Sequence, residues 1–120
     1  MAKLQITTIN VRGMTTPKKL SDFQFFLNHC DSDVLLLQKI HKHDFNWLSL
    51  KFVFSPGSSN ARGVAIIVLN RSLVLSESLV DQEGRIVSAL ISTAGNSVRV
   101  LNIYAPNVPT ERKSFFFKGQ

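Results

Sequence analysis

Residues 63–69, GVAIIVL, put apolar side chains on both sides of an extended chain, because every residue after the glycine is Ala, Val, Ile or Leu. Residues 84–91, GRIVSALI, also carry apolar side chains on both sides. Strands of this kind need cover over both faces of their sheet. The sequence shows one convincing helix and two weaker candidates, which would cover one face only. We therefore predict one bare face, unless a partner chain or a second half of the same fold covers it.

Short apolar segments separated by turn signals give the order of the predicted elements. A helix is predicted at 17–29, with one or two helical turns near 44–50 and a further helix from Pro109 or Thr110. The predicted strands are LQITTIN (4–10), VLLLQ (34–38), KFVFS (51–55), GVAIIVLN, SLVLSESLV, GRIVSALIST and SVRVLNIYAPN. With 120 residues the chain holds one domain at most, with the order β-α-β followed by an antiparallel meander.

The composition favours a polyanionic partner. The formal net charge is +6, and no basic amphipathic helix stands out, so nucleic acid is favoured over a membrane surface. Cys30 is the single cysteine, which excludes an internal disulfide and favours a reducing compartment, the nucleus or cytoplasm. No apolar window reaches the length of about eighteen residues that a membrane span requires.

A cluster of basic residues follows the strand VLLLQ directly. Lys39, His41, Lys42 and His43 lie where a strand end can face a cleft, since a charge in a closed interior is costly unless it is paired. The simplest interpretation is a solvated loop. A zinc pair formed by His41 and His43 is a weak alternative, because H-x-H lacks further Cys or His ligands nearby.

Five motifs in order carry a resemblance to a known family: ITTINVRG, VLLLQKIH, SSNARGVAII, DQEGRIV and NIYAPN, followed by ERKSFF. The set resembles the N-terminal half of an endonuclease/exonuclease/phosphatase domain of the kind found in non-LTR (LINE-type) retrotransposons. The resemblance implies an α/β fold that forms half of a four-layer sandwich. We expect one mixed sheet with helices on one face, in a partial domain over residues 1–120 that stops before the second sheet. The uncovered face would then allow self-association.

The resemblance also implies a site that has lost its metal ligand. The family's asparagine at the metal and phosphate site is present as Asn10, and the tyrosine close to the scissile phosphate is present as Tyr104. The family's second motif, similar to LQET, ends in a glutamate that binds the metal, and Lys39 stands in its place. Because Mg²⁺ needs oxygen ligands, we expect this chain to bind none. From the residues alone, Asn10 also suits a turn and Tyr104 a half-buried strand position.

Polar and basic residues in two other motifs are candidate contacts to nucleic acid, with DNA favoured over RNA. These are Asn60, Arg62 and Arg85. The loop that holds Asn60 needs no ligand to explain it, and for Arg62, Arg85 and Arg99 plain solvation is the favoured interpretation. Three functions remain open at this stage: a degenerate endonuclease-like domain without independent catalysis, a non-catalytic nucleic-acid-binding remnant, or a metal-dependent phosphodiesterase completed by further sequence or a partner chain.

Overall fold

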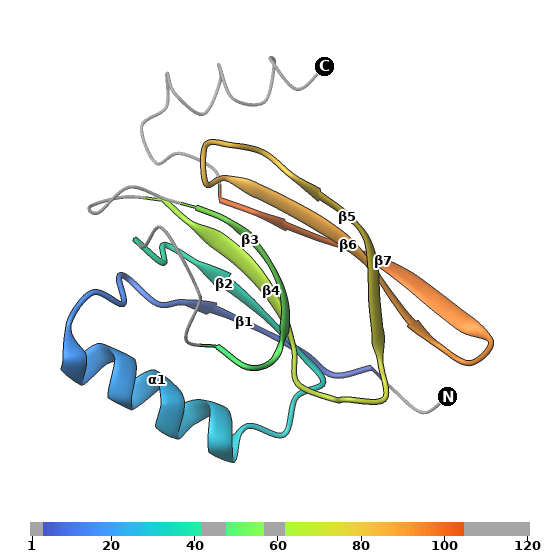
Figure 1. The fold of residues 1–120 in the computed structure, drawn as a ribbon, viewed down its shortest axis with the longest axis horizontal. Helices are drawn as coiled ribbons and strands as arrows, with labels where there is room; N and C mark the ends of the chain where they lie inside the picture. Colours follow the sequence, from blue (N-terminus) through green and yellow to red (C-terminus); the bar gives the residue numbers. More distant parts are fainter. Residues whose placement is uncertain (1–3, 42–47, 57–61, 105–120) are drawn as a thin grey trace.

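The structure, a computed structural model, describes residues 4–41, 48–56 and 62–104. Its first sheet has four strands in the order β1-β2-β4-β3 (Figure 1). In this sheet β1 pairs parallel to β2, and the remaining pairs are antiparallel. The bounds are Ile6–Asn10 for β1, Val34–Gln38 for β2, Lys51–Ser55 for β3 and Val64–Val68 for β4.

A second sheet of three antiparallel strands, in the order β5-β6-β7, lies against the first. These strands are Val74–Val80 (β5), Ile86–Thr93 (β6) and Asn96–Ile103 (β7). β3 packs against β5 and β6, while β4 packs against β6 and β7. The core between the two sheets is built from buried Val, Ile and Ala side chains, with Val64, Ile66, Val87 and Ala89 fully buried.

The expectation of one mixed sheet is wrong, because the described strands form two sheets. After β4 the chain turns at residues 69–73 and crosses to the other layer, where Leu73 is buried beside the first sheet. The last three predicted strands therefore form a sheet of their own and cover the face of the first sheet that lies away from α1, while Leu79 and Leu101 stay exposed on the outer face of this second sheet. The physical reason is that β6 carries a continuous inward row, Val87, Ala89 and Ile91, which is buried only against a second apolar surface.

The other face of the first sheet is covered by α1, residues Pro17–His29. The helix starts as expected: Thr16 is the N-cap, its hydroxyl accepts a hydrogen bond from the Lys19 amide at 3.2 Å, and Pro17 occupies the first turn. Phe23 is buried against Leu35 and neighbouring side chains of the sheet. The predicted helix and the strand cores are thus confirmed. Most of the helical turns near 44–50, and the helix from 109 or 110, lie outside the described residues.

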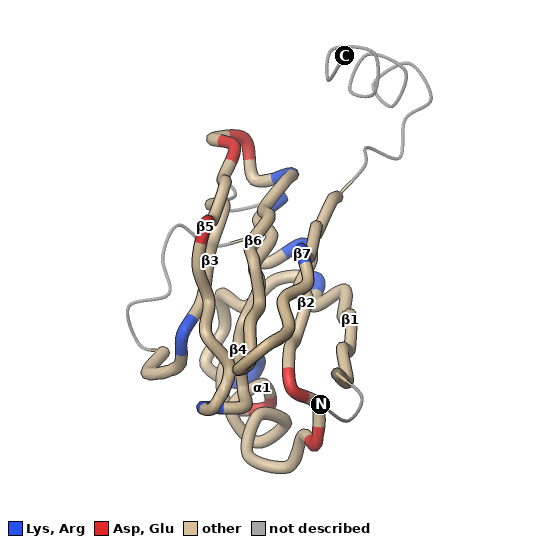
Figure 2. The backbone as a smooth tube through the Cα atoms, turned by 90° about the vertical axis from the view of Figure 1, so that its right-hand side faces the viewer, with Lys and Arg blue, Asp and Glu red and all other residues tan. Residues whose placement is uncertain are grey.

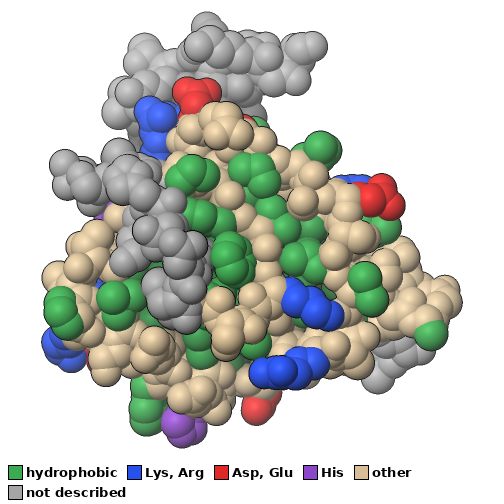
Figure 3. Space-filling model, viewed as in Figure 1, with side chains coloured by type: hydrophobic (Ala, Val, Ile, Leu, Met, Phe, Trp, Pro, Cys, Tyr) green, Lys and Arg blue, Asp and Glu red, His purple; other side chains and the backbone are tan. Residues whose placement is uncertain are grey.

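The edge of the sandwich formed by β3 and β5 is tied by side chains that cross between the layers. The Lys51 ammonium donates to the Leu73 carbonyl at 2.9 Å, and the Ser55 hydroxyl lies 2.8 Å from the Asp81 carbonyl oxygen. Figure 3 views this side, where hydrophobic side chains are interspersed with polar ones. Among the described residues, no helix is long and apolar enough to cross a membrane.

A buried asparagine joins the two sheets near the other edge. Asn102 in β7 is 3% exposed, and its amide nitrogen donates to the carbonyls of Leu37 and Ala65 at 2.9 and 2.8 Å. Its carbonyl oxygen accepts a hydrogen bond from the Gln38 side chain at 2.9 Å. One side chain therefore connects β7 to both β2 and β4, and it does so at the end of the sandwich where β2 terminates.

Replacing this asparagine should weaken the contact between the sheets. We expect Asn102→Ala to lower the free energy of unfolding by about 2–3 kcal/mol, because three hydrogen bonds are lost and a cavity is left. Urea denaturation followed by circular dichroism measures the change. The control is Asn96→Ala, at the exposed start of β7, with an expected effect of about 0.5 kcal/mol or less. Equal effects of the two variants would contradict the bridging role.

Candidate functional site

The carboxyl ends of β1, β2 and β7 meet at one end of the sandwich around an open groove of about 620 Å³. Asn10, Lys39 and Tyr104 all line it, although they come from three motifs far apart in the sequence. Thr8, Gln38 and Asn102 add polar side chains to the lining, and Leu36, Leu101 and Ile103 add apolar ones. Lysine and arginine positions gather near β2 and β7 in Figure 2. The structure thus brings together the three residues that the sequence marked as the core of the site.

Backbone hydrogen bonds connect the loops that carry these motifs. The loop after β1 bonds to the loop after β2, which bonds to the segment before β4, and that segment bonds in turn to the loop before β6. The bonds are Val11 N to Gln38 O (3.0 Å), Gly13 N to Lys39 O (2.7 Å), Ile40 N to Gly63 O (3.0 Å), Gly63 N to Gly84 O (2.9 Å) and Tyr104 N to Arg85 O (2.7 Å). Because each loop fixes the next, the groove has a defined backbone frame.

Four basic residues of these loops have left-handed backbone conformations that side chains other than glycine rarely adopt. Their φ angles are +54° for Arg12, +57° for Lys39, +60° for His41 and +66° for Arg62. Each such residue costs about 1–3 kcal/mol, which the surrounding hydrogen bonds and packing must offset. Ile40, between two of them, is fully buried. The reversal of the backbone on either side of Ile40 leaves Lys39 at the groove while the isoleucine anchors the loop.

Two cations lie near the face of the groove tyrosine. The Lys39 ammonium is 5.7 Å from the centre of the Tyr104 ring, and the Arg85 guanidinium carbon is 6.0 Å from it. Both distances are in the range of cation–π attraction, which offsets part of the repulsion between the two like charges. The groove therefore holds the charge of Lys39 and the ring of Tyr104, with Arg85 as a second cation near that ring, an arrangement suited to an anionic, planar ligand.

The pKa of the His41 imidazole, two residues after Lys39, is lowered. Burial lowers the pKa of His41 below its usual 6.5, and the positive charges of Lys39 and Lys19 lower that pKa further. A zinc pair with His43 is not tested, because His43 lies outside the described residues.

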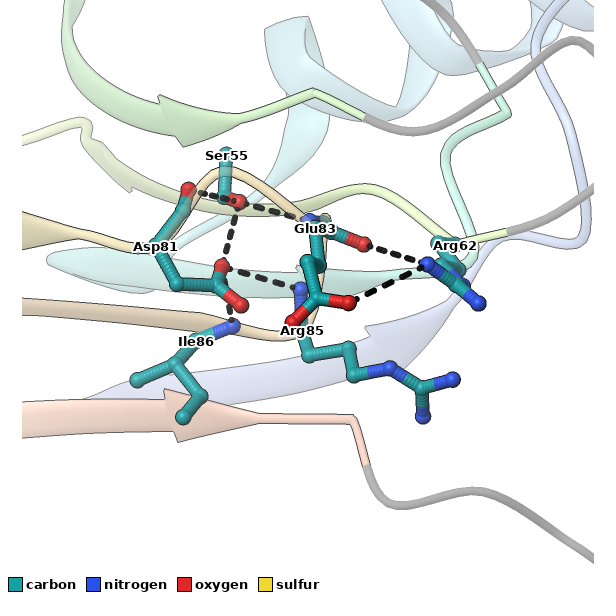
Figure 4. A network of polar contacts seen from close by, with 7 residues as sticks. Ser55, Arg62, Asp81, Glu83, Arg85 and Ile86 are labelled. Atoms are coloured by element: carbon teal, nitrogen blue, oxygen red, sulfur yellow. Dashed lines mark hydrogen bonds and ion pairs between the residues drawn. The ribbon is translucent and has the colours of Figure 1, made fainter. Parts of the chain in front are cut away.

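A network of polar contacts fixes the turn that presents Arg85 (Figure 4). The Asp81 carboxylate accepts hydrogen bonds from the amides of Arg85 and Ile86 at 3.2 and 3.1 Å, and it lies 2.7 Å from the Ser55 hydroxyl oxygen. Ser55 is fully buried and accepts a hydrogen bond from the Gly84 amide at 2.9 Å. The turn between β5 and β6 is thereby bound to the end of β3.

Arg62 lies at the outer side of the same turn. Its guanidinium is 4.0 Å from the Glu83 carboxylate and donates to the Glu83 carbonyl oxygen at 3.4 Å. Both side chains are substantially exposed, so this pair contributes little stability. Arg62 and Arg85 are the two predicted nucleic-acid contacts that the structure describes, and both belong to the loops that frame the groove. Asn60 lies outside the described residues.

The residues that line the groove do not fit a magnesium ion. Mg²⁺ is held in proteins through carboxylates and other oxygen ligands, whereas the described lining contains no carboxylate and presents the Lys39 ammonium. In the parts of the chain that the structure describes, no three His, Cys, Asp or Glu side chains gather as a metal site. The position that the resemblance assigns to a metal-binding glutamate is therefore occupied by a cation.

Sequence analysis missed Thr8, Gln38 and Asn102 as groove residues. Gln38 and Asn102 do stand inside the quoted motifs, directly before Lys39 and two residues before Tyr104. The available signal was alternation: on β7, Val98, Val100 and Asn102 share the face toward the first sheet, so a polar residue in that row is either paired or at a site. Which strands Asn102 contacts depends on how the two sheets pack together.

The comparisons with known proteins agree on the fold. No protein-family model matches the chain. Among solved structures, D. rerio TDP2 complexed with a single-strand DNA product matches with a TM-score of 0.69 and 19% identity, over 99% of this chain and 54% of that chain. C. elegans TDP2 matches with a TM-score of 0.68 and 16% identity, over 97% and 40%. The Neisseria 3′ phosphatase NExo, bound to a product DNA hairpin, matches with a TM-score of 0.61 and 26% identity, over 98% and 48%.

These matches define the class of fold. The chain is a mixed α/β structure, mostly strands with one described helix, and it is similar to part of the endonuclease/exonuclease/phosphatase fold. It spans about half the length of the solved structures that it matches.

The glycine of the DQEGRIV motif should be essential for this frame. Gly84 has a φ of +74°, and an added Cβ would lie 2.6 Å from the Pro56 carbonyl oxygen and 2.7 Å from the Gly63 amide nitrogen. We expect Gly84→Ala to destabilise the fold by about 3 kcal/mol or more, from backbone strain and overpacking together. Urea denaturation of the purified variant measures this loss.

A matched control separates the two causes. Gly95 also has a positive φ, +91°, but an added Cβ there would meet nothing within 4 Å. Gly95→Ala should therefore show the strain alone, about 1–2 kcal/mol. Equal losses of stability in the two variants would show that close packing of the loops around Gly84 does not require a glycine there.

Proposed function

We propose that this chain is a partial, degenerate endonuclease-like domain of the LINE retroelement kind that does not hydrolyse phosphodiesters by itself. In this proposal, residues 1–120 correspond to the N-terminal half of a four-layer α/β sandwich. The observation that carries it is the Lys39 ammonium in the same groove as Asn10 and Tyr104, with no carboxylate among the described lining residues. The order of the five motifs supports the retroelement kind.

Hydrolysis of a phosphodiester needs an activated water. Either a metal lowers the pKa of bound water, or a general base takes its proton. Lys39 disfavours a divalent cation at this position, because its own charge repels the metal and it supplies no oxygen ligand. The other polar side chains of the groove are amides, a threonine hydroxyl and a tyrosine, and none of these is a general base at neutral pH. The described side chains of the groove can bind a phosphate group, but they cannot activate the water that would attack it.

A second candidate function is binding of nucleic acid without catalysis, with DNA favoured. Lys39 and Arg85 can neutralise phosphate oxygens, while the ring of Tyr104 offers a surface on which a base could stack. Arg62 and Asn60 would extend the contact along the loops. Two of the solved structures with a similar fold contain product DNA, which supports this class of ligand.

The competing function is a metal-dependent phosphodiesterase completed by further sequence or a partner chain. Its support is that Asn10 and Tyr104 lie in one groove, as an intact site would require. Lys39 is the main argument against it. The two proposals make opposite predictions for Mg²⁺ dependence.

The Lys39→Glu variant tests the metal argument directly. We expect the wild-type chain to show no saturable Mg²⁺ or Mn²⁺ binding by isothermal titration calorimetry, and no nicking of supercoiled DNA. Lys39→Glu should gain measurable metal affinity, because a carboxylate and the Asn10 amide oxygen would then face the same groove. The variant should remain inactive in the nicking assay, since the groove still lacks a general base.

Arg71→Glu is the matched control, because it makes the same charge change at an exposed residue in the turn after β4, at the opposite end of the sandwich. It should gain no specific metal affinity. Metal-dependent nicking by the wild-type chain that survives repurification would refute the degenerate assignment and favour the phosphodiesterase.

Binding to nucleic acid should be weak, independent of sequence and strongly dependent on salt. Each phosphate contact releases counterions, so the slope of log affinity against log salt should change by about 0.7 for each cation removed from a single-stranded complex. We expect Lys39→Gln and Arg85→Gln each to reduce both affinity and slope in fluorescence anisotropy with labelled oligonucleotides. Arg71→Gln, at an exposed residue in the turn after β4 at the opposite end of the sandwich, should change neither. Binding that ignores salt would exclude this mode.

A further inference from the structure

The two sheets end unevenly on the side away from β3 and β5. The first sheet ends in β1 and the second in β7, and in the described part of the chain neither edge pairs with another strand. β7 lies against β2 and β4, so β1 extends one strand past it, as Figure 2 shows. The side chains of β1 that face the second layer, Ile6, Thr8 and Asn10, are accordingly exposed. This side of the sandwich is a step rather than a closed edge.

Both edges present free backbone groups along the step. In β7 the Tyr104 amide bonds toward β6, so by alternation Arg99, Leu101 and Ile103 direct their backbone groups to the open side. In β1 the Val11 amide bonds to β2, so the backbone groups of Ile6, Thr8 and Asn10 point outward in the same way. Open edges like these are ready to pair with another strand.

The step lacks the features that normally protect an edge. The strands ITTIN and NSVRVLNI contain no proline and one charged residue, Arg99, which pairs with Glu77 at 3.3 Å. Ile6 and Val98 are each 43% exposed, one on each edge. The cations of the groove lie beyond the strand ends, so the net charge of +6 does not oppose contact along the edge itself.

Cavities lie along this side of the molecule. A groove of about 500 Å³, lined in part by Ile9, Met14 and Phe26, opens between β1 and α1. A second cavity, of about 350 Å³, lies between Leu4 and the start of β7, where Val98 contributes to its wall. Together with the groove described above, they leave both faces of β1 incompletely covered.

We propose that this stepped side is the interface for a second copy of the same chain. A two-fold rotation about an axis parallel to the strands, between the two layers, sets β7 of the other copy beside β1 and β1 of the other copy beside β7. β1 and β7 both run toward the groove, since Asn10 and Ile103, the last residues of the two strands, line it. The new pairs are therefore parallel, and two continuous sheets result.

A second copy fits because the step is complementary to itself. β1, the strand by which the first sheet extends past the second, fills the open position beside β7 of the other copy. The two-fold rotation forms this contact twice. An unrelated partner would have to match both edges and their offset separately. Because Thr8, Asn10 and Leu101 belong both to the step and to the groove lining, the dimer and a nucleic acid lying along these strands exclude each other.

The arrangement has a consequence for the groove. The other copy's β1 lies opposite β1, across Thr8, Leu36 and Leu101, which line the groove. The dimer therefore fills this part of the groove.

The first test measures the oligomeric state of the 120-residue chain. Size-exclusion chromatography with light scattering should give the mass of a dimer at micromolar concentration. Ile6→Lys should raise the dimer dissociation constant by about 100-fold or more, because two ammonium groups would be buried near the axis. Phe25→Lys is the control, since Phe25 is 66% exposed on α1 away from the step, and it should leave the dimer intact.

A cross-link separates loss of the interface from loss of folding. In a Cys30→Ser background, Ile6→Cys should form a disulfide-linked dimer under mild oxidation, because Ile6 of one copy faces Ile6 of the other across the axis. Phe25→Cys in the same background should not. A monomeric wild-type chain overturns the proposal. So does a dimer that fails to cross-link through residue 6 or that survives Ile6→Lys unchanged, because either result places the interface elsewhere.

Discussion

The burial of β4 on both faces is the constraint on which the rest of the structure depends. All five residues from Val64 to Val68 are buried, so the strand needs an apolar layer on each side. α1 supplies one layer and the sheet β5-β6-β7 supplies the other. Once the second sheet lies across β4, the ends of β2 and β7 come together, and the Asn102 side chain joins them. The groove exists because these two layers meet at that point.

The chemistry of the groove follows from what its frame permits. The loops around it are bound to one another through backbone groups, so their side chains are free to vary without loss of the frame. Lys39 gives the groove a positive charge, which favours anions there. Tyr104 lies near the two positive charges of Lys39 and Arg85.

Prediction of the fold succeeded where information was local. The helix at Pro17–His29 follows from its N-cap and from Phe23 at helical spacing, and each predicted strand core was found. The separate sheet of β5, β6 and β7 was not predicted. The sequence pattern of an antiparallel meander is the same whether its strands extend the first sheet or fold back over it. Asn10, Lys39 and Tyr104, which were singled out from the sequence, line one groove, whereas the contacts of Asn102 could not be predicted without knowing which strands it meets.

The sequence by itself determined the elements, the apolar rows that must be covered and the charge at position 39, since these depend on residues within one segment. The tertiary structure alone decided that the second sheet covers the first, that Arg85 lies 6.0 Å from the ring of Tyr104, and that β1 extends past β7. The physical reason is that burial can be satisfied by any apolar partner. Only the packing of the two layers fixes which partner is used, and with it which distant side chains meet and which edges stay open.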